Sequence, residues 1–402
     1  MIKRLVNIAL TLLISSIVFS QNANQQAVFS ALNYLSHNQT DSALIVLEEQ
    51  NNCIECKKII AEIYFSEKNL LNAAHAYKEL SEFYPSESYF RLSVIYAGLG
   101  FSQESVKYLD KHFEYPNPKS YSSIMFYNEF DEINTTTEWK EFWNEERYSK
   151  KEIQLEEAKY LISTEEYDNA LKILEEINFS SQKAQVNYLM AYIYANFENW
   201  SEAYSYVNEA IVAEFDYVDA LTLKRDIEIE RGMNEEALLS NISLMNADPY
   251  NPYLIRKHAE LLYQNEKPRE ADQYLDEYLE FFSDDEQANH LKTKILSADE
   301  DFKNALINLN LLIDQNPSKS EYFIERADIY YTLESWRFAS NDYSMALDIN
   351  PRLPEVWYHF GVCQFNMNNQ KAACNAWERA ANLKSKEAVK MLYKYCKYIS
   401  LK

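Results

Sequence analysis

The chain has 402 residues, of which 62 are acidic and 39 basic, so its formal net charge is −23. This length exceeds the size at which a single hydrophobic core usually stops growing, which indicates several domains or an array of repeats. The negative charge would repel nucleic acid and anionic lipid surfaces, and the four glycines form no phosphate-binding loop, so we expect neither a nucleic-acid partner nor a nucleotide enzyme.

Residues 1–20 have the pattern of a secretory signal peptide. Two basic residues precede an apolar run from Leu5 to Phe19, and Ser20 offers a small side chain for cleavage before Gln21. A transmembrane anchor needs roughly 20 apolar residues, and this run is shorter and interrupted by polar ones, so we favour the signal peptide over the anchor. We therefore expect an exported chain in the periplasm or cell envelope, with no transmembrane anchor after cleavage.

A period of about 34 residues runs through most of the chain, and its clearest copy lies between Pro317 and Pro351. A large residue stands four positions after each small one in most repeats, and Asn241 is the exception. Because small residues let two helices approach closely, we predict an all-α chain, an α-α superhelix of about ten helix-turn-helix repeats. The small residues that mark the contact between the two helices are Ala43, Ala73, Ser105, Ala170, Ala203, Ala237, Ala271, Ala305, Ala339 and Ala373.

Residues 118–150 break this period and divide the array. We predict three repeats in residues 21–117 and seven in residues 151–384, joined by a bridge that does not repeat. The bridge is too rich in aromatic residues for a disordered linker, so we expect it to pack across the joint. The alternative is that Trp139 and Trp143 form an exposed anchor for a partner, since tryptophan is enriched at interface hot spots.

Residues 385–402 are predicted to form a capping helix, which hides the last apolar surface of the array. Cys374 lies on the second helix of the last repeat, and Cys396 lies on the capping helix. If these two helices form an antiparallel hairpin, the two cysteines could lie opposite each other. We predict a disulfide between them, with two buried thiols as the alternative. Cys363 would then remain a single buried thiol.

The chain also contains a CxxC motif, Cys53 to Cys56, between the first two repeats. A thioredoxin-like site would need a βαβ setting, a c-type haem would need a histidine where Lys57 stands, and zinc would need two further ligands. A local disulfide or two inert thiols are therefore expected. The six histidines are scattered, with His258 on a seam position, and no catalytic motif occurs. We predict no enzyme activity, no cofactor and no metal.

The repeat pattern resembles the tetratricopeptide repeat family over about residues 24–117 and 151–384. Trp357 and Trp377 match its motif closely, whereas the repeat that contains Arg225 departs from it on the first helix. The C-terminal end also resembles the related Sel1-type repeat. The resemblance implies a right-handed solenoid whose concave wall is formed by the first helix of each repeat.

In that family geometry the concave wall carries aromatic residues with a polar group, which suit peptide recognition. The alternative for any one of these rings is packing between repeats. Acidic side chains outnumber basic ones at the wall positions, so we expect a protein or peptide partner with a basic or neutral segment. The residues predicted to bind it are Tyr188, Tyr192, Tyr253, Arg256, Tyr263, Tyr331 and Tyr358.

These features predict a non-catalytic protein-protein interaction scaffold of the bacterial cell envelope. The chain is also similar to exported repeat proteins of Bacteroidota-type bacteria, some of which serve secretion or surface assembly. The alternative function is a glycan- or peptidoglycan-binding module, in which the tyrosines of the groove would stack on sugar rings.

Overall fold

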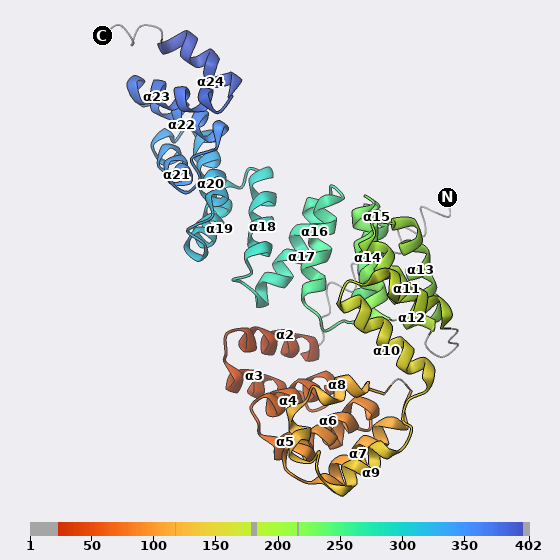
Figure 1. Ribbon diagram of the computed structural model, residues 1–402. Helices are drawn as coiled ribbons and strands as arrows, with labels where there is room; N and C mark the ends of the chain where they lie inside the picture. Colours follow the sequence, from red (N-terminus) through yellow and green to blue (C-terminus); the bar gives the residue numbers. More distant parts are fainter. Residues whose placement is uncertain (1–22, 117, 178–182, 215–216, 397–402) are drawn as a thin grey trace, which may run out of the picture. The chain divides into compact units, whose positions relative to one another are not determined.

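The structure is a computed structural model that describes residues 23–116, 118–177, 183–214 and 217–396. Every regular element in these ranges is helical (Figure 1). The chain divides into two compact units, which we call unit 1 (Met1–Asn265) and unit 2 (Glu266–Lys402). The expected signal peptide lies outside the described residues. Within them, each helix is too short or too polar to cross a membrane.

Unit 1 consists of helical hairpins and the bridge. Its helices are α2 (Ala23–Ser36), α3 (Thr40–Glu48), α4 (Ile54–Ser66), α5 (Leu70–Leu80), α6 (Pro85–Gly98), α7 (Ser102–Phe113), α8 (Tyr121–Met125), the 3-10 helix η1 (Asn128–Glu132), α9 (Thr137–Asn144), α10 (Lys150–Ser163), α11 (Tyr167–Glu176), α12 (Lys183–Asn196), α13 (Trp200–Ala213), α14 (Val218–Glu230), α15 (Asn234–Ala247) and α16 (Tyr253–Gln264).

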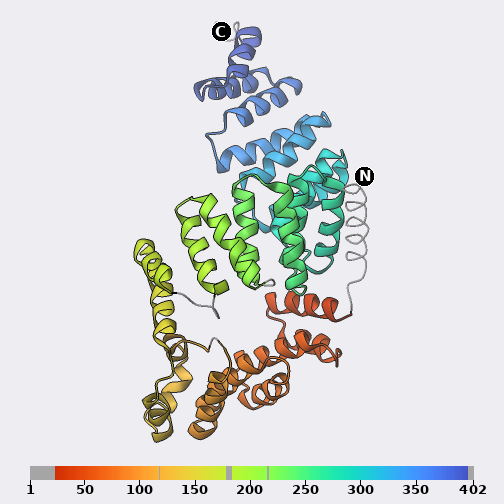
Figure 2. The ribbon, with the colours of Figure 1, turned by 90° about the vertical axis from the view of Figure 1, so that its right-hand side faces the viewer.

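Unit 2 continues the same pattern. Its elements are α17 (Pro268–Phe281), α18 (Glu286–Ala298), α19 (Phe302–Gln315), α20 (Ser320–Thr332), α21 (Trp336–Ile349), α22 (Pro354–Asn366), α23 (Gln370–Asn382), α24 (Lys386–Met391) and the π-helical turn η2 (Leu392–Cys396). The hairpins α20–α21 and α22–α23 stack directly, since α21 packs against both α20 and α22 (Figure 2). The predicted all-α array of helix-turn-helix repeats is therefore confirmed.

The small residue predicted at each helix contact is the fourth residue of a second helix in all ten cases. Each of the ten side chains, from Ala43 to Ala373, is 0% exposed. The residue four positions later, one turn along the same face, is at most 2% exposed in every repeat. In the hairpins that lie within one unit, this pairing of two buried residues closes the contact between the two helices.

The turn between the two helices has a constant backbone conformation. The residue five positions before each small residue has a positive φ, between 53° and 77°, and thereby ends the first helix in the left-handed region. Only two of the ten are glycine, although glycine adopts this conformation most easily. These residues are Asn38, Lys68, Gly100, Glu165, Glu198, Gly232, Glu266, Glu300, Glu334 and Asn368.

The bridge forms α8, η1 and α9 and packs on α6 and α7. Trp139 is 5% exposed and stacks on Phe130, with ring centroids 4.9 Å apart. Trp143 is half-buried in the same cluster, edge-on to Phe142 at 4.8 Å, and Leu109 of α7 completes the contact. The alternative that the two tryptophans form an exposed anchor is wrong, because their rings are used to cover the end of the α6–α7 hairpin.

Asn241 stands on α15 where other second helices carry a large apolar or aromatic residue. It is 0% exposed, and its Oδ1 accepts a hydrogen bond from Nη1 of Arg225 at 3.2 Å while its Nδ2 donates to the Leu254 carbonyl at 3.1 Å. Arg225 lies on α14, and its Nη2 also donates to Asp226 at 2.9 Å. In this repeat a hydrogen-bonded pair replaces apolar packing, which explains why its first helix departs from the motif.

The last hairpin is covered by α24 and η2, as expected for a capping segment. Ala388 of α24 is fully buried against a cluster that contains Trp377. A disulfide joins Cys374 to Cys396, with Cα atoms 5.8 Å apart, and a second disulfide closes the Cys53 to Cys56 motif. Cys363 is a free, buried thiol, and burial raises its pKa to about 12.

Candidate functional site

The seven residues predicted to bind a partner all lie on first helices of hairpins, and each is at least partly exposed. Helices α12 and α16 belong to unit 1, whereas α20 and α22 belong to unit 2. The structure therefore gathers the seven residues into local groups within each unit. The groups are Tyr188 and Tyr192 on α12, Tyr253, Arg256 and Tyr263 on α16, and Tyr331 and Tyr358 on α20 and α22.

In unit 1 the predicted residues form aromatic pairs on the helix surface. The rings of Tyr188 and Tyr192 lie 6.5 Å apart, and Tyr217 at the start of α14 contacts Tyr188 edge-on at 5.3 Å. Burial, followed by the negative charge of Asp219, raises the pKa of Tyr188. On α16 the guanidinium of Arg256 lies 5.7 Å from the ring of Tyr253, which is 54% exposed.

The densest group lies in unit 2, and we call Asp328, Tyr331, Tyr343, Tyr358 and His359 the Tyr331 cluster. Tyr331 stacks on His359 with ring centroids 5.1 Å apart and lies 6.5 Å from the ring of Tyr343. His359 in turn contacts Tyr358 at 5.2 Å. Tyr331 of α20 and His359 of α22 thus meet over Tyr343, which is fully buried in the seam of α21, while Tyr358 also packs against the cluster that contains Trp377.

The Tyr331 cluster contains one carboxylate. Tyr343 donates its hydroxyl hydrogen to Oδ1 of Asp328 at 2.5 Å, and Nδ1 of His359 lies 4.0 Å from the same oxygen. Burial raises the pKa of Asp328, while the hydrogen bond from Tyr343 and the charge of His359 oppose that rise. About half of the Asp328 side chain still faces solvent, so the carboxylate is accessible to a positively charged group.

Sequence analysis did not single out His359, although it follows Tyr358 directly on the same helix. No other repeat of this chain has a histidine at the equivalent position, so the repeat pattern gave no signal for it. Asp328 is one of the acidic residues at the wall positions, and it shares a helix face with Tyr331 because the two lie three residues apart. Two aromatic rings beside such a carboxylate on neighbouring first helices are suited to hold a cationic side chain.

A separate cavity of about 380 Å³ lies in unit 1, between the bridge and the hairpins on either side of it. Its lining is mostly polar and includes His112, Lys119, Tyr148, Glu152 and Lys159. The cations of this lining are already paired, since Nζ of Lys119 lies 3.6 Å from Glu87 and that of Lys159 lies 2.6 Å from Glu156. None of the seven predicted binding residues lines this cavity.

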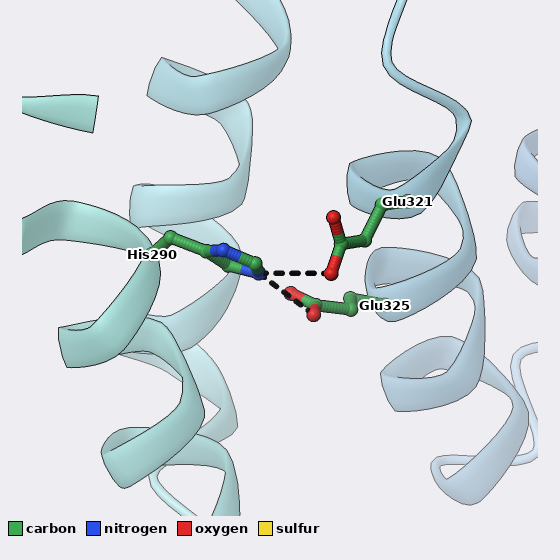
Figure 3. A group of neighbouring side chains, drawn as sticks. All are labelled: His290, Glu321 and Glu325. Carbon is green, nitrogen blue, oxygen red and sulfur yellow. Dashed lines mark hydrogen bonds and ion pairs between the residues drawn. The ribbon is translucent and has the colours of Figure 1, made fainter. Parts of the chain in front are cut away.

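One group of potential metal ligands also occurs in unit 2. Nε2 of His290 on α18 lies 2.8 Å from Oε1 of Glu325 and 3.7 Å from Oε1 of Glu321, both on α20 (Figure 3). Sequence analysis predicted no metal cluster, because these residues come from two different repeats and match no known ligand spacing.

Neither the protein-family models nor the curated protein sequences give a match to this chain. Solved structures do. The C-terminal part of a TPR repeat-containing protein from Cytophaga hutchinsonii aligns with a TM-score of 0.52 at 12% identity, over 59% of this chain and 99% of its own. A tetratricopeptide repeat protein from Parabacteroides merdae aligns with a TM-score of 0.45 at 17% identity, over 61% of this chain and 98% of its own.

The TPR protein YrrB, whose structure is described as having an unusual peptide-binding site, aligns with a TM-score of 0.39 at 20% identity, over 45% of this chain and 92% of its own. The match to the Cytophaga structure, together with the ten buried small residues, shows that this chain has the tetratricopeptide-repeat fold.

Proposed function

We propose that the chain is a non-catalytic scaffold of the bacterial cell envelope that binds protein partners on the first helices of its repeats. Secretion and surface assembly are the processes that such a scaffold would serve. The observation that carries the proposal is the Tyr331 cluster, in which Tyr331, Tyr358 and His359 remain partly exposed although the neighbouring seam residues Ala339 and Tyr343 are fully buried.

The chemistry of this cluster favours a basic segment of a partner. A lysine or arginine side chain would pair with the Asp328 carboxylate and lie against the faces of the tyrosines, each contact being worth about 0.5 to 2 kcal/mol. The net charge of −23 would also speed the encounter with a basic partner. Tyrosine adds contact area with few rotatable bonds to immobilise.

Two further features support the rest of the proposal. The disulfides Cys53–Cys56 and Cys374–Cys396 are typical of an oxidising compartment, as is the signal-peptide pattern of residues 1–20. The thiol closest to the cluster, Cys363, is buried and has a pKa of about 12, so it stays protonated at neutral pH and supplies no nucleophile.

The experiment that tests the proposal is affinity capture from an envelope extract of the source cells. The bait is the chain from Gln21 onward, compared with the double variant Tyr331→Ala/Tyr358→Ala. Phe338→Ala is the matched control, because Phe338 is a 59% exposed aromatic residue on the second helix α21 of the same unit. Circular dichroism establishes that all three baits are folded.

Proteins that the native chain and Phe338→Ala retain, and the double variant loses, would support a binding surface on the first helices. Equal retention by all three baits would contradict it. If retention of the bound material survives digestion of the extract by a protease, the ligand is a glycan and the alternative function replaces the proposed one.

A further inference from the structure

His290, Glu321 and Glu325 converge at one point between neighbouring repeats of unit 2. One candidate ligand atom from each residue lies within 4.8 Å of the other two. Figure 3 shows the imidazole of α18 pointing toward both carboxylates of α20. The imidazole is held in this direction, since only 16% of its side chain is exposed and its ring packs edge-on against Tyr322 at 5.1 Å.

The two carboxylates face His290, and among the described residues no lysine or arginine lies beside them. Glu321 and Glu325 are four residues apart on one helix face, an arrangement in which like charges destabilise a helix. Among the described residues, neither forms an ion pair with a lysine or arginine, and His290 is the group that faces both. Other acidic residues of unit 2 do have such partners, as Asp342 has Arg326 and Asp272 has Lys292.

A second observation concerns the other oxygen of Glu325. Oε2 of Glu325 is buried from solvent and has no hydrogen-bond donor within the described residues. A buried carboxylate oxygen without a donor loses its hydration without compensation, so such atoms generally have a partner. The oxygen belongs to the same carboxylate whose other oxygen contacts His290, and a cation placed between the three side chains would reach it.

The spacing of the ligand atoms fits a small transition-metal ion. Bonds of about 2.0 to 2.2 Å place neighbouring ligands of a tetrahedral ion about 3.3 to 3.6 Å apart. The separations of 2.8 Å and 3.7 Å from His290 lie on either side of that range, and all three ligand atoms lie within 4.8 Å of one another, so small side-chain rotations would be needed for coordination. One imidazole and two carboxylates suit zinc and its neighbours better than calcium or magnesium, which prefer oxygen alone.

We propose that His290, Glu321 and Glu325 form a binding site for a divalent transition-metal ion of the zinc type, which fastens α18 to α20. Three protein ligands leave a fourth coordination position for water or for a donor group from a partner. The site is independent of the proposed peptide binding, because it uses none of the residues of the Tyr331 cluster.

The test uses the full chain, freed of metal by a chelator, and Co²⁺ as a spectroscopic substitute for Zn²⁺. Co²⁺ bound by imidazole and carboxylate in a four-coordinate site gives visible absorption bands that the aqueous ion lacks at that strength, and Zn²⁺ should abolish them by displacement. The variants are His290→Gln and Glu325→Gln. His75→Gln is the control, because His75 pairs with Glu79 at 3.5 Å on an exposed helix face without a third ligand.

We expect the native chain to bind one Co²⁺. Both His290→Gln and Glu325→Gln remove a direct ligand, so each should lower the Co²⁺ affinity by more than the roughly 10- to 100-fold that is typical when a residue behind a ligand is changed. His75→Gln should bind as the native chain does. The proposal is overturned if the native chain shows no such bands, or if the two site variants keep the native affinity while remaining folded by circular dichroism.

Discussion

The indole of Trp377 on α23 lies directly against the backbone of Gly361 on α22. A Cβ atom at position 361 would stand 2.5 Å from Nε1 of Trp377, and this nitrogen donates a hydrogen bond to the Tyr358 carbonyl at 3.2 Å. Trp377 is fully buried, so it cannot move aside. The close approach of the two helices in the last repeat therefore requires glycine at position 361.

We expect Gly361→Ala to lower the free energy of unfolding of unit 2 by about 1 to 3 kcal/mol, because the added methyl group overpacks the seam. Urea denaturation followed by tryptophan fluorescence measures the change. Gly98→Ala is the control, since the Cβ there would meet the flexible Glu129 side chain at 3.1 Å. An unchanged midpoint for Gly361→Ala would show that the indole is not packed as described.

At the left-handed turn residues, in contrast, we expect a substitution by glycine to stabilise the fold. Glu334 has a φ of 53°, a conformation that costs a residue with a Cβ about 1 to 2 kcal/mol and glycine almost nothing. Replacing Glu334 by glycine would remove this conformational cost, but part of the benefit is offset because glycine has more freedom in the unfolded chain. We expect Glu334→Gly to raise the thermal midpoint slightly and Glu334→Val to lower it. The turn would differ from the one described if valine were tolerated better than glycine.

Arg225 and Asn241 should be strongly coupled. Asn241→Leu restores the apolar seam residue of other repeats, but it leaves Nη1 of Arg225 without its acceptor and the Leu254 carbonyl without its side-chain donor. We expect it to destabilise by about 1 to 3 kcal/mol. In a double-mutant cycle, Arg225→Met should recover part of the loss, with a coupling energy of about 0.5 to 3 kcal/mol. Additive effects of the two changes would mean that the hydrogen bond contributes nothing to the folded state.

The stability of unit 1 should depend on the protonation of His112. The ring is 2% exposed, its Nε2 accepts a hydrogen bond from the Lys119 backbone N–H at 2.8 Å, and its Nδ1 therefore carries the proton that is donated to the Ser86 carbonyl at 2.9 Å. Burial lowers the pKa of His112 from its ordinary value of about 6.5.

A histidine whose pKa is lower in the folded chain than in the unfolded chain stabilises the fold above about pH 6.5, and that stability is lost as the pH falls through the folded pKa. Urea midpoints measured between about pH 7.5 and pH 5 should fall with acidification. His112→Gln should remove part of this dependence, whereas His75→Gln, at an exposed site, should keep it. Identical pH profiles for the native chain and His112→Gln would contradict the prediction.

Much of the fold was predictable because each repeat obeys the same packing constraint. A residue such as Ala339 must be small for two helices to touch, and this requirement recurs every 34 residues over most of the array. The cap and the approach of Cys374 to Cys396 follow from the same antiparallel geometry. The left-handed turns were not predicted. Glycine would have indicated them, but most of these positions hold other residues, such as Glu300 and Glu334.

The candidate site was only partly predictable. Positions such as Tyr331 follow from the register of the repeat, but the contacts that select one group over another depend on side chains from different repeats. His290 and Glu325 are 35 residues apart and meet only because their helices are neighbours. The division into two units between Asn265 and Glu266 could not be predicted from the sequence either, because the repeat period continues across it.

The central claim, that first-helix side chains of unit 2 bind a basic peptide segment, is tested most directly by selecting peptides from a random displayed library on the purified chain. We expect the selected peptides to be enriched in lysine and arginine and to bind Phe338→Ala as they bind the native chain. They should bind Tyr331→Ala/Tyr358→Ala at least about tenfold more weakly, which corresponds to about 1.4 kcal/mol. The claim is contradicted if no peptide is enriched, or if the selected peptides bind the folded double variant with undiminished affinity.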